Sequence, residues 1–520
     1  MQYESNYFLF YWLLSLLPIA LLLFTLLKLK WKSQQAALLS LVVALLASLL
    51  VFGISGQGLL VATGKGLSLS LFVLLIIWSA VILYHFAREA GALEEISSSM
   101  AHLSRGRLLQ LLLMSWCFSS FIQGISGFGV PVAIVAPLMV GMGFDPLVAA
   151  ATTLVGHSWA VTFGSMASSF YTLQLVTALP EDLLAFWLGI LFLLPILFCG
   201  LAVAHIYGGW RAVREALPTV VMVSAVMGLT QLLVPQLGAV QLGSVLAGLF
   251  GTLTILIISR FRAGEEGDAF SSSSAEGSMT LREAFLPYLS LILLIIVFQP
   301  APIREALAGF RIGFSFPEAV TAWGYRVPAV TDYAAIRLFA HPAPFILFST
   351  LLAALFYRRR GYFKAGALQR IRSKTVGQCL PTTISISLLV VMALVMKDSG
   401  MTVLLAQGVA NLSGQLYPIF SPLVGVLGSF MTGSNTNSNV LFGAFQREVA
   451  LNLGLQAWII AAAQSVGGSL GSAVAPAKAL LGASTVGITG REGELLQKTL
   501  SYTLINVLLV GILTLLFTLW

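Results

Sequence analysis

Long apolar segments recur along the whole chain, and short polar or basic stretches separate them. A bilayer core about 30 Å thick needs roughly 20 apolar residues per helix, and twelve segments meet this requirement. They predict membrane-spanning helices near residues 8–27, 36–54, 67–86, 146–166, 183–206, 217–235, 239–258, 284–299, 343–357, 376–396, 456–476 and 499–520. Glu4 precedes the first segment and Lys28, Lys30 and Lys32 follow it, which favours a retained helix over a cleaved signal peptide.

Two further apolar segments, 108–144 and 417–454, are interrupted by glycine, proline and small polar residues. The first contains Gln123-Gly124-Ile125-Ser126-Gly127-Phe128-Gly129-Val130-Pro131, and the second contains Thr432-Gly433-Ser434-Asn435-Thr436-Asn437-Ser438-Asn439. At membrane depth a broken helix must be buried in protein or line a wet cavity, because its bare backbone groups are costly in lipid. We therefore expect two re-entrant hairpins with tips near the midplane; the alternative is an ordinary loop outside the membrane.

The two interrupted segments resemble each other and are followed by similar sequences. Ala150-Ala151-Thr152-Thr153-Leu154-Val155-Gly156-His157-Ser158 aligns with Ala461-Ala462-Ala463-Gln464-Ser465-Val466-Gly467-Gly468-Ser469 at five identical positions. The predicted topology has the first hairpin entering from the cytoplasm and the second from outside. This pattern predicts an inverted-topology repeat with halves 1–258 and 285–520, joined by a cytoplasmic linker at 259–284.

The composition supports a membrane protein and excludes several other classes. Charged residues make up 9% of the chain, too few to cover the surface of a soluble protein, and the net charge of +8 is scattered, which argues against nucleic-acid binding. Basic loops stay in the cytoplasm, and placing all five of them inside puts both termini outside. The most basic loop, 358–374, also allows contact with lipid headgroups. The three cysteines match no disulfide framework or zinc spacing, and we expect no metal site and no cofactor.

Small polar side chains and glycines at the hairpin tips are suited to binding a small anion. Unpaired N–H groups at broken helix ends attract anions, and hydroxyl and amide groups add hydrogen bonds. Lys478 could offset the charge of a bound anion or extend to the interface, and His157 could relay protons or be a neutral core histidine. Unwound carbonyls could instead hold Na⁺. The candidate substrate-binding residues are Gln123, Ser126, Gly127, Ser434, Asn435, Thr436, Asn439, Gln464 and Lys478, and His157 is the candidate coupling residue.

The same residues resemble the lactate permease family. The resemblance is carried by Gly124-x-x-Gly127-Phe128-Gly129-Val130-Pro131, by Gly141-Met142-Gly143-Phe144, by the 432–439 segment and by Gly487-Ile488-Thr489-Gly490-Arg491-Glu492-Gly493. It implies proton-coupled transport of lactate or glycolate across the inner membrane. The Ser434-Asn435-Thr436 triplet is also similar to the tip motif of dicarboxylate/sodium symporters in the broader ion-transporter superfamily. Where the family commonly has Glu, Asp and Lys, this chain has Gln123, Asn435 and Ser472, which puts proton coupling through carboxylates in doubt.

We therefore expect a secondary active transporter of small 2-hydroxy monocarboxylates that works by alternating access. Its partners would be the anion, a proton or sodium ion, and membrane lipids; the sequence does not determine the oligomeric state. The nearest alternative is a sodium-coupled transporter of another organic or sulfonated anion. An integral membrane enzyme is disfavoured, because the chain has no H-E-x-x-H motif, paired carboxylates or nucleophile elbow.

Overall fold

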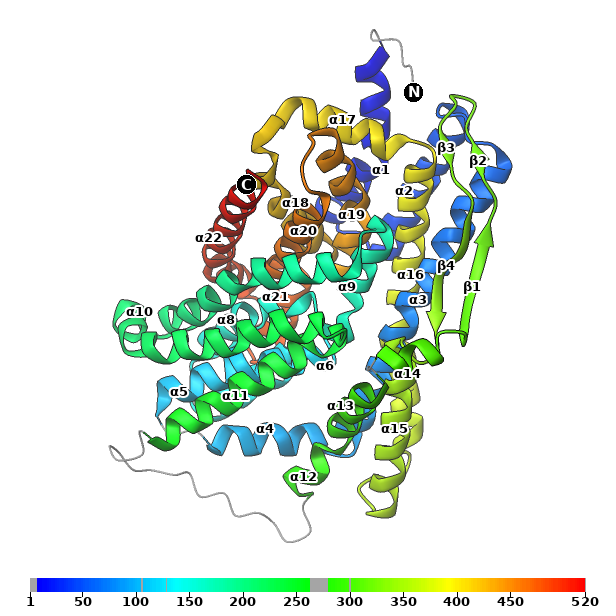
Figure 1. Cartoon of the computed structure of the whole chain (residues 1–520). Helices are drawn as coiled ribbons and strands as arrows, with labels where there is room; N and C mark the ends of the chain where they lie inside the picture. The colour runs from blue at the N-terminus through cyan, green and yellow to red at the C-terminus, as the bar shows by residue number, and fades with distance from the viewer. Residues whose placement is uncertain (1–6, 104–105, 128, 262–278, 299–300, 520) are drawn as a thin grey trace.

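The computed structural model describes residues 7–519 apart from 104–105, 128, 262–278 and 299–300, and this part of the chain is predominantly helical (Figure 1). Within these residues, nine helices are long and apolar enough to cross a membrane. Large apolar side chains are exposed along many of them, as expected of surfaces that face lipid. The predicted fold class, an all-α integral membrane protein, is confirmed.

A central group of helices contains the two predicted hairpins, and its elements follow the same order in both halves of the chain. Each half has a hairpin, then a helix broken near its middle, then a long helix. The first half comprises α5 (Arg107–Leu112), the π-helix η2 (Leu113–Phe118), α6 (Ser119–Ile125), α7 (Val130–Gly141), α8 (Pro146–Gly156), the 3₁₀ helix η3 (Ser158–Val161), α9 (Gly164–Thr177) and α10 (Glu181–Gln236). The second half comprises α18 (Tyr417–Thr432), α19 (Asn435–Asn452), α20 (Ala457–Gly471), the 3₁₀ helix η6 (Ser472–Val474), α21 (Pro476–Thr485) and α22 (Glu492–Thr518).

The long helix α10 is two antiparallel helices joined by a turn. Gly208 and Gly209 leave the helical region, and the two ends meet where Gln236 Nε2 donates to the Asp182 carbonyl at 3.1 Å. Two spans were predicted here, at 183–206 and 217–235. The short helix η4 (Val240–Leu242) and α11 (Gly243–Phe261) follow and pack on α6 and α10.

A peripheral group of helices packs beside the central group. It consists of α1 (Phe8–Leu27), α2 (Ser33–Leu50), α3 (Gly56–Glu89), α13 (Leu286–Phe298), α15 (Pro342–Arg359) and α16 (Ala367–Asp398). A buried ion pair joins α3 to α16, with Lys65 Nζ 3.2 Å from Asp398 Oδ2. Shorter helices connect these elements: α4 (Ala92–Leu103), α12 (Leu281–Ala284), α14 (Ala301–Ala306), α17 (Met401–Ser413) and the 3₁₀ helix η5 (Gly414–Leu416).

The segment between α14 and α15 forms two small antiparallel ribbons, which the sequence did not indicate. Strand β1 (Arg311–Phe316) pairs with β4 (Val330–Arg337), and β2 (Ala319–Val320) pairs with β3 (Arg326–Val327). The ribbons lie along α3, where the edge of the Phe316 ring occupies the space beside Gly64. Both ends of the described chain lie in the upper part of Figure 1, and α4, α12 and the end of α15 lie at the bottom.

The structure differs from the prediction in two of the expected spans and in the second hairpin. The spans expected at 146–166 and 456–476 are interrupted, by η3 and the turn before α9 and by η6 before α21. The break in the second hairpin covers only Gly433 and Ser434, because the polar residues from Asn435 to Asn439 form the first turn of α19. Residues 262–278 of the predicted linker lie outside the described residues. The side of the membrane on which each loop lies stays a prediction.

Glycines allow the second hairpin to pack directly on α20. A Cβ atom on Gly425 would lie 2.0 Å from the Gln464 carbonyl oxygen, and one on Gly467 would lie 1.9 Å from the Pro422 carbonyl oxygen. Gly471 is similarly close to the backbone of Val426. At these positions the main chains of α18 and α20 touch, and no side chain would fit between them.

Candidate binding site at the hairpin tips

The breaks in α8–α9 and the helix α20 cross each other, and the hydroxyl of Ser469 joins them. Ser469 Oγ accepts hydrogen bonds from the N–H groups of Val161 at 3.1 Å and Thr162 at 3.3 Å. It donates to the Ser158 carbonyl at 2.6 Å. These contacts provide partners for backbone groups that the break leaves without a regular helical pattern.

The first turn of α19 places two asparagines against this crossing. Asn435 Nδ2 donates to Thr162 Oγ1 at 3.0 Å and to Ser465 Oγ at 3.3 Å. Asn439 Nδ2 donates to the same Ser465 Oγ at 2.9 Å and to the Ser169 carbonyl at 3.0 Å. The carbonyl oxygens of both asparagine side chains are buried without a hydrogen-bond partner among the described residues. They are hydrogen-bond acceptors that no described group of the protein uses.

The remaining tip residues of the second hairpin are positioned by helix capping. Ser434 is the N-cap of α19, and its Oγ accepts from the Asn437 N–H at 3.3 Å. Thr436 Oγ1 and Ser169 Oγ lie 2.9 Å apart, which ties the tip to α9. Ser434 and Gly433 are half-buried, whereas Asn435, Thr436 and Asn439 are buried. The tip is therefore packed on one side and partly accessible on the other.

The tip of the first hairpin packs on the start of α9. Gly127 has φ +62°, and a Cβ atom there would lie 1.7 Å from Ser165 Oγ. Ser126 donates its hydroxyl to the Ile122 carbonyl at 3.0 Å. Gln123 is 2% exposed, and its Oε1 is buried without a partner among the described residues. Only glycine allows this close approach at position 127.

The start of α9 has an unusual backbone. Ser165, Met166 and Ala167 have φ values of +47°, +54° and +60°, in the left-handed region that side chains other than glycine rarely adopt. Such residues persist where surrounding contacts impose them, and they concentrate at functional sites. Here they lie beside the first hairpin, and the last of them is two residues before Ser169.

Both hairpin tips reach the same short helix, α21. A Cβ atom on Gly129 would lie 2.5 Å from Leu481 Cδ2, and one on Gly433 would lie 3.6 Å from Ala477 Cβ. Positions 477 and 481 are one helical turn apart on one face. The first turn of α21 also carries Lys478, which is 8% exposed and has no carboxylate partner among the described residues. The N-termini of α7 and α19 therefore meet α21, and each helix start adds a partial positive charge to that of the buried ammonium group.

His157 lies at the end of α8 and is completely buried. Its Nδ1 is 2.5 Å from the Thr153 carbonyl oxygen. Because a carbonyl only accepts, Nδ1 carries the proton, and Nε2 is left as an acceptor without a hydrogen-bond partner among the described residues. Lys478 acts electrostatically on this imidazole. The buried acceptor of His157 therefore lies within electrostatic range of the Lys478 ammonium group.

Gln464 is placed differently from the other candidate residues. Its Nε2 donates to Ser438 Oγ at 3.0 Å, and its Oε1 accepts from Gln446 Nε2 at 2.8 Å. These bonds use both ends of the amide to hold the second hairpin on α20.

Sequence reasoning did not select the hydroxyl groups that complete the site, because serine and threonine are common in apolar helices. They belong to Thr162, Ser165, Ser169, Ser465 and Ser469.

A multi-pass helical membrane protein with a buried polar site between two hairpins is of the permease class. The chain belongs to the L-lactate permease family, whose sequence profile matches residues 11–519. The expected resemblance is thus confirmed, and so is a multi-pass protein of the cell membrane, the inner membrane in bacteria.

The relatives of this chain are similar over nearly their whole length. The L-lactate permease of Escherichia coli (strain K12) is 28% identical, over 97% of this chain and 95% of its own. The L-lactate permease of Salmonella typhimurium is 30% identical over the same shares, and the glycolate permease GlcA of Escherichia coli is 26% identical, again over 97% and 95%.

Two solved structures are similar at a lower level. The YdaH transporter of Alcanivorax borkumensis is 16% identical with a TM-score of 0.45, covering 85% of this chain and 84% of its own. MtrF of Neisseria gonorrhoeae, described with a class of antimetabolite efflux pumps, is 17% identical with a TM-score of 0.45, covering 95% and 96%.

Proposed function

We propose that the protein is a secondary active transporter of small 2-hydroxy monocarboxylates such as lactate and glycolate. The observation that carries the proposal is that the N-termini of α7 and α19 both meet α21, whose first turn holds the buried, unpaired Lys478. A buried cation without a partner is costly, and an anionic ligand would offset that cost. The relatives named as lactate and glycolate permeases support this class of anion.

The groups around the tips can account for both parts of such a substrate. The carboxylate would be bound by the N–H groups at the start of α19 and α21 and by the ammonium group of Lys478. The 2-hydroxyl would donate to an amide oxygen that has no partner, of which Asn435 and Asn439 offer two. The half-buried tip residues Gly433 and Ser434 would admit the substrate. Alternating access would expose this site to each side in turn.

Proton coupling would use groups other than tip carboxylates. Gln123 and Asn435 stay neutral, and Ser472 has a buried hydroxyl without a partner among the described residues. The free Nε2 of His157 and the ammonium group of Lys478, which acts on it electrostatically, are the two groups proposed to handle the proton. In this proposal His157 takes up the coupling proton through Nε2 while the substrate carboxylate neutralises the lysine.

Sodium coupling, with the same or another organic or sulfonated anion, is a second candidate. The unpaired side-chain oxygens of Gln123, Asn435 and Asn439 favour it, because hard cations prefer amide and carbonyl oxygens. The two candidates predict different driving forces.

The test is uptake of labelled lactate and glycolate into proteoliposomes, with pH and Na⁺ gradients imposed separately. Proton coupling predicts accumulation driven by an inward proton gradient alone, and sodium coupling predicts accumulation driven by Na⁺ alone. Uptake of neither acid under either gradient would overturn the substrate assignment.

The role of Lys478 is tested by replacing it with Gln and comparing uptake with the same replacement at another lysine. Losing one partner of a buried charge pair costs about 2–5 kcal/mol, so Lys478→Gln should lower the uptake rate at low substrate concentration roughly 100-fold. The control Lys498→Gln, on α22, should transport normally. If both variants retain parental uptake, the carboxylate does not bind at Lys478.

A further inference from the structure

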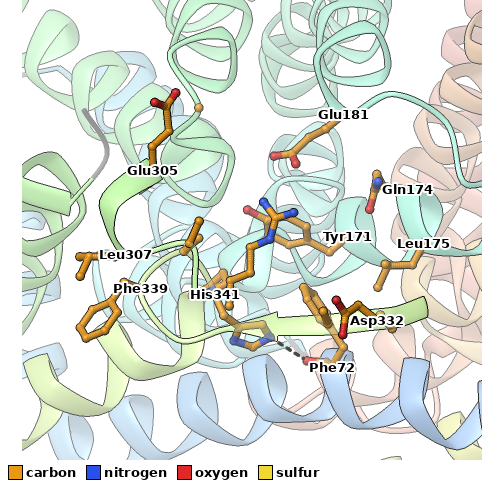
Figure 2. A pocket seen from close by; sticks show the side chains of 17 residues that line it. Phe72, Tyr171, Gln174, Leu175, Glu181, Glu305, Leu307, Asp332, Phe339 and His341 are labelled. Carbon is orange, nitrogen blue, oxygen red and sulfur yellow. Dashed lines mark hydrogen bonds between the residues drawn. The ribbon is translucent and has the colours of Figure 1, made fainter. Parts of the chain in front are cut away.

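A cavity of about 620 Å³ lies between the central and peripheral groups, away from the hairpin tips (Figure 2). Tyr171 and Gln174 of α9 and Glu181 of α10 line it from the central group. Phe72 of α3 and residues of β4 line it from the peripheral side. Figure 2 shows Glu181, Glu305 and Asp332 around a space floored by Phe72 and His341. The cavity is hydrophilic at its rim and aromatic at its floor.

The loops that surround this cavity belong to one side of the predicted topology. Its walls include Glu181 at the start of α10, Gly238 just after its end, and several residues of the segment 305–342. These three loops are far apart in the sequence, and the distribution of basic loops places each of them outside. Their convergence on one cavity therefore predicts that it opens on the outer face.

The helix α9 borders both the cavity and the candidate binding site. Ser169 contacts Thr436 and Asn439 of the second hairpin, and Tyr171, two residues later, faces the cavity. The rings of Tyr171 and Phe72 lie 5.9 Å apart between centroids, at the contact between α9 and α3. A helix is roughly 10 Å across, so displacement of this aromatic contact would connect the cavity to the site.

We propose that the cavity is the outer vestibule of the transport route and that Phe72 and Tyr171 form the barrier at its inner end. The solute is a small hydrophilic organic anion in water. The wall offers it the guanidinium group of Arg337 beside the carboxylates of Glu181 and Glu305. The third carboxylate, Asp332, is paired with Arg311 at 2.9 Å. Tyr171 is held by its hydroxyl, which donates to Gln241 Oε1 at 3.2 Å. Phe72 is held by His341, whose ring packs edge-on at 4.3 Å. This inference rests on the proposed transport function.

Cysteine labelling tests the position of the vestibule without needing a substrate. Cys117, Cys199 and Cys379 are buried, so the parent protein should react little with a membrane-impermeant sulfonated thiol reagent. Ala335→Cys, on the cavity wall, should be labelled when the reagent is added outside right-side-out vesicles and not when it is confined inside. Absence of outside labelling would overturn the assignment of the cavity to the outer face.

A second labelling measurement tests the barrier. Ser169→Cys should react slowly from outside in the parent and at least tenfold faster when combined with Phe72→Ala. Phe72→Leu retains a bulky apolar side chain and should keep the reaction slow. If Ser169→Cys reacts at the same rate whether position 72 holds Phe, Leu or Ala, the ring of Phe72 is not the barrier.

Uptake separates a vestibule from an unrelated outer cavity. A bulky adduct on Cys at position 335 should block uptake of the solute that the parent carries, whereas the same adduct on Val320→Cys, exposed on β2, should not. If neither adduct affects uptake, the vestibule is refuted. If the parent carries no 2-hydroxy acid, the proposed substrate fails, but both labelling results still decide the position of the cavity and the barrier.

Discussion

The hydroxyl of Ser469 offers the sharpest test of the way the two halves of the chain are held together. It contacts backbone groups more than 300 residues away, at Ser158, Val161 and Thr162. Ser469→Ala removes the acceptor for two buried N–H groups and the donor to one carbonyl. Each unsatisfied buried group costs about 1–3 kcal/mol. Because the 3₁₀ turn offers partial alternative bonds, we expect a net loss of about 3 kcal/mol in the free energy of unfolding.

The measurement is denaturant unfolding in detergent, followed by tryptophan fluorescence. Ser472→Ala is the matched control: Ser472 is equally buried, lies one turn further along the same broken helix, and has a hydroxyl without a partner among the described residues. It should change the free energy of unfolding by less than about 0.5 kcal/mol. Equal losses in the two variants would refute the role of the Ser469 hydrogen bonds.

Three other substitutions have clear expected outcomes. Gly127→Ala places a Cβ atom against Ser165 Oγ at a positive φ and should lower stability by about 2–4 kcal/mol in thermal unfolding. Lys65→Met leaves Asp398 buried and unpaired and should cost about 3–5 kcal/mol, whereas adding Asp398→Leu should recover most of it. Burial lowers the pKa of His341, just before α15, to about 4. As the pH falls, the unfolded chain therefore protonates this imidazole before the folded protein does. The free energy of unfolding should fall by roughly 2 kcal/mol from pH 6.5 to pH 5, and this loss should be absent in His341→Asn.

The controls for these variants are equally specific. Gly377→Ala, in α16, meets open space and should slightly stabilise the helix. A double variant at positions 65 and 398 that is as unstable as the single one would show that the ion pair does more than satisfy two buried charges. An unchanged acid slope in His341→Asn would assign the pH dependence to other groups.

The helix interruptions in these two segments could be predicted because their signal is composition, whereas their re-entrant course in the membrane stays a prediction. The expected bounds of 108–144 and 417–454 differ by at most three residues from the observed helical limits of 107–141 and 417–452. Glycine and proline at membrane depth have few explanations other than a protected break. The second break was predicted too long because serine and asparagine favour helix starts as well as loops, and Ser434 is an N-cap.

The breaks in the two crossing helices could not be read from the sequence. Ser158–Phe163 and Ser472–Ala475 are as apolar as their surroundings. In the first break, the N–H groups of Val161 and Thr162 are satisfied by Ser469, more than 300 residues away. The ribbons between α14 and α15 were missed for a similar reason, since they pack on α3 rather than forming a sheet core. Tertiary contacts determine these elements, and local pattern does not.

The glycine contacts between α18 and α20 limit the way the second hairpin can move. Where main chain touches main chain, there are no side-chain rotamers that could readjust to absorb a shift. The hairpin therefore cannot swing away from α20 like a hinged flap; the two must travel as one stiff block. Any change of access at this tip would then be a displacement of that block past its neighbours, with sliding confined to the contacts that side chains make.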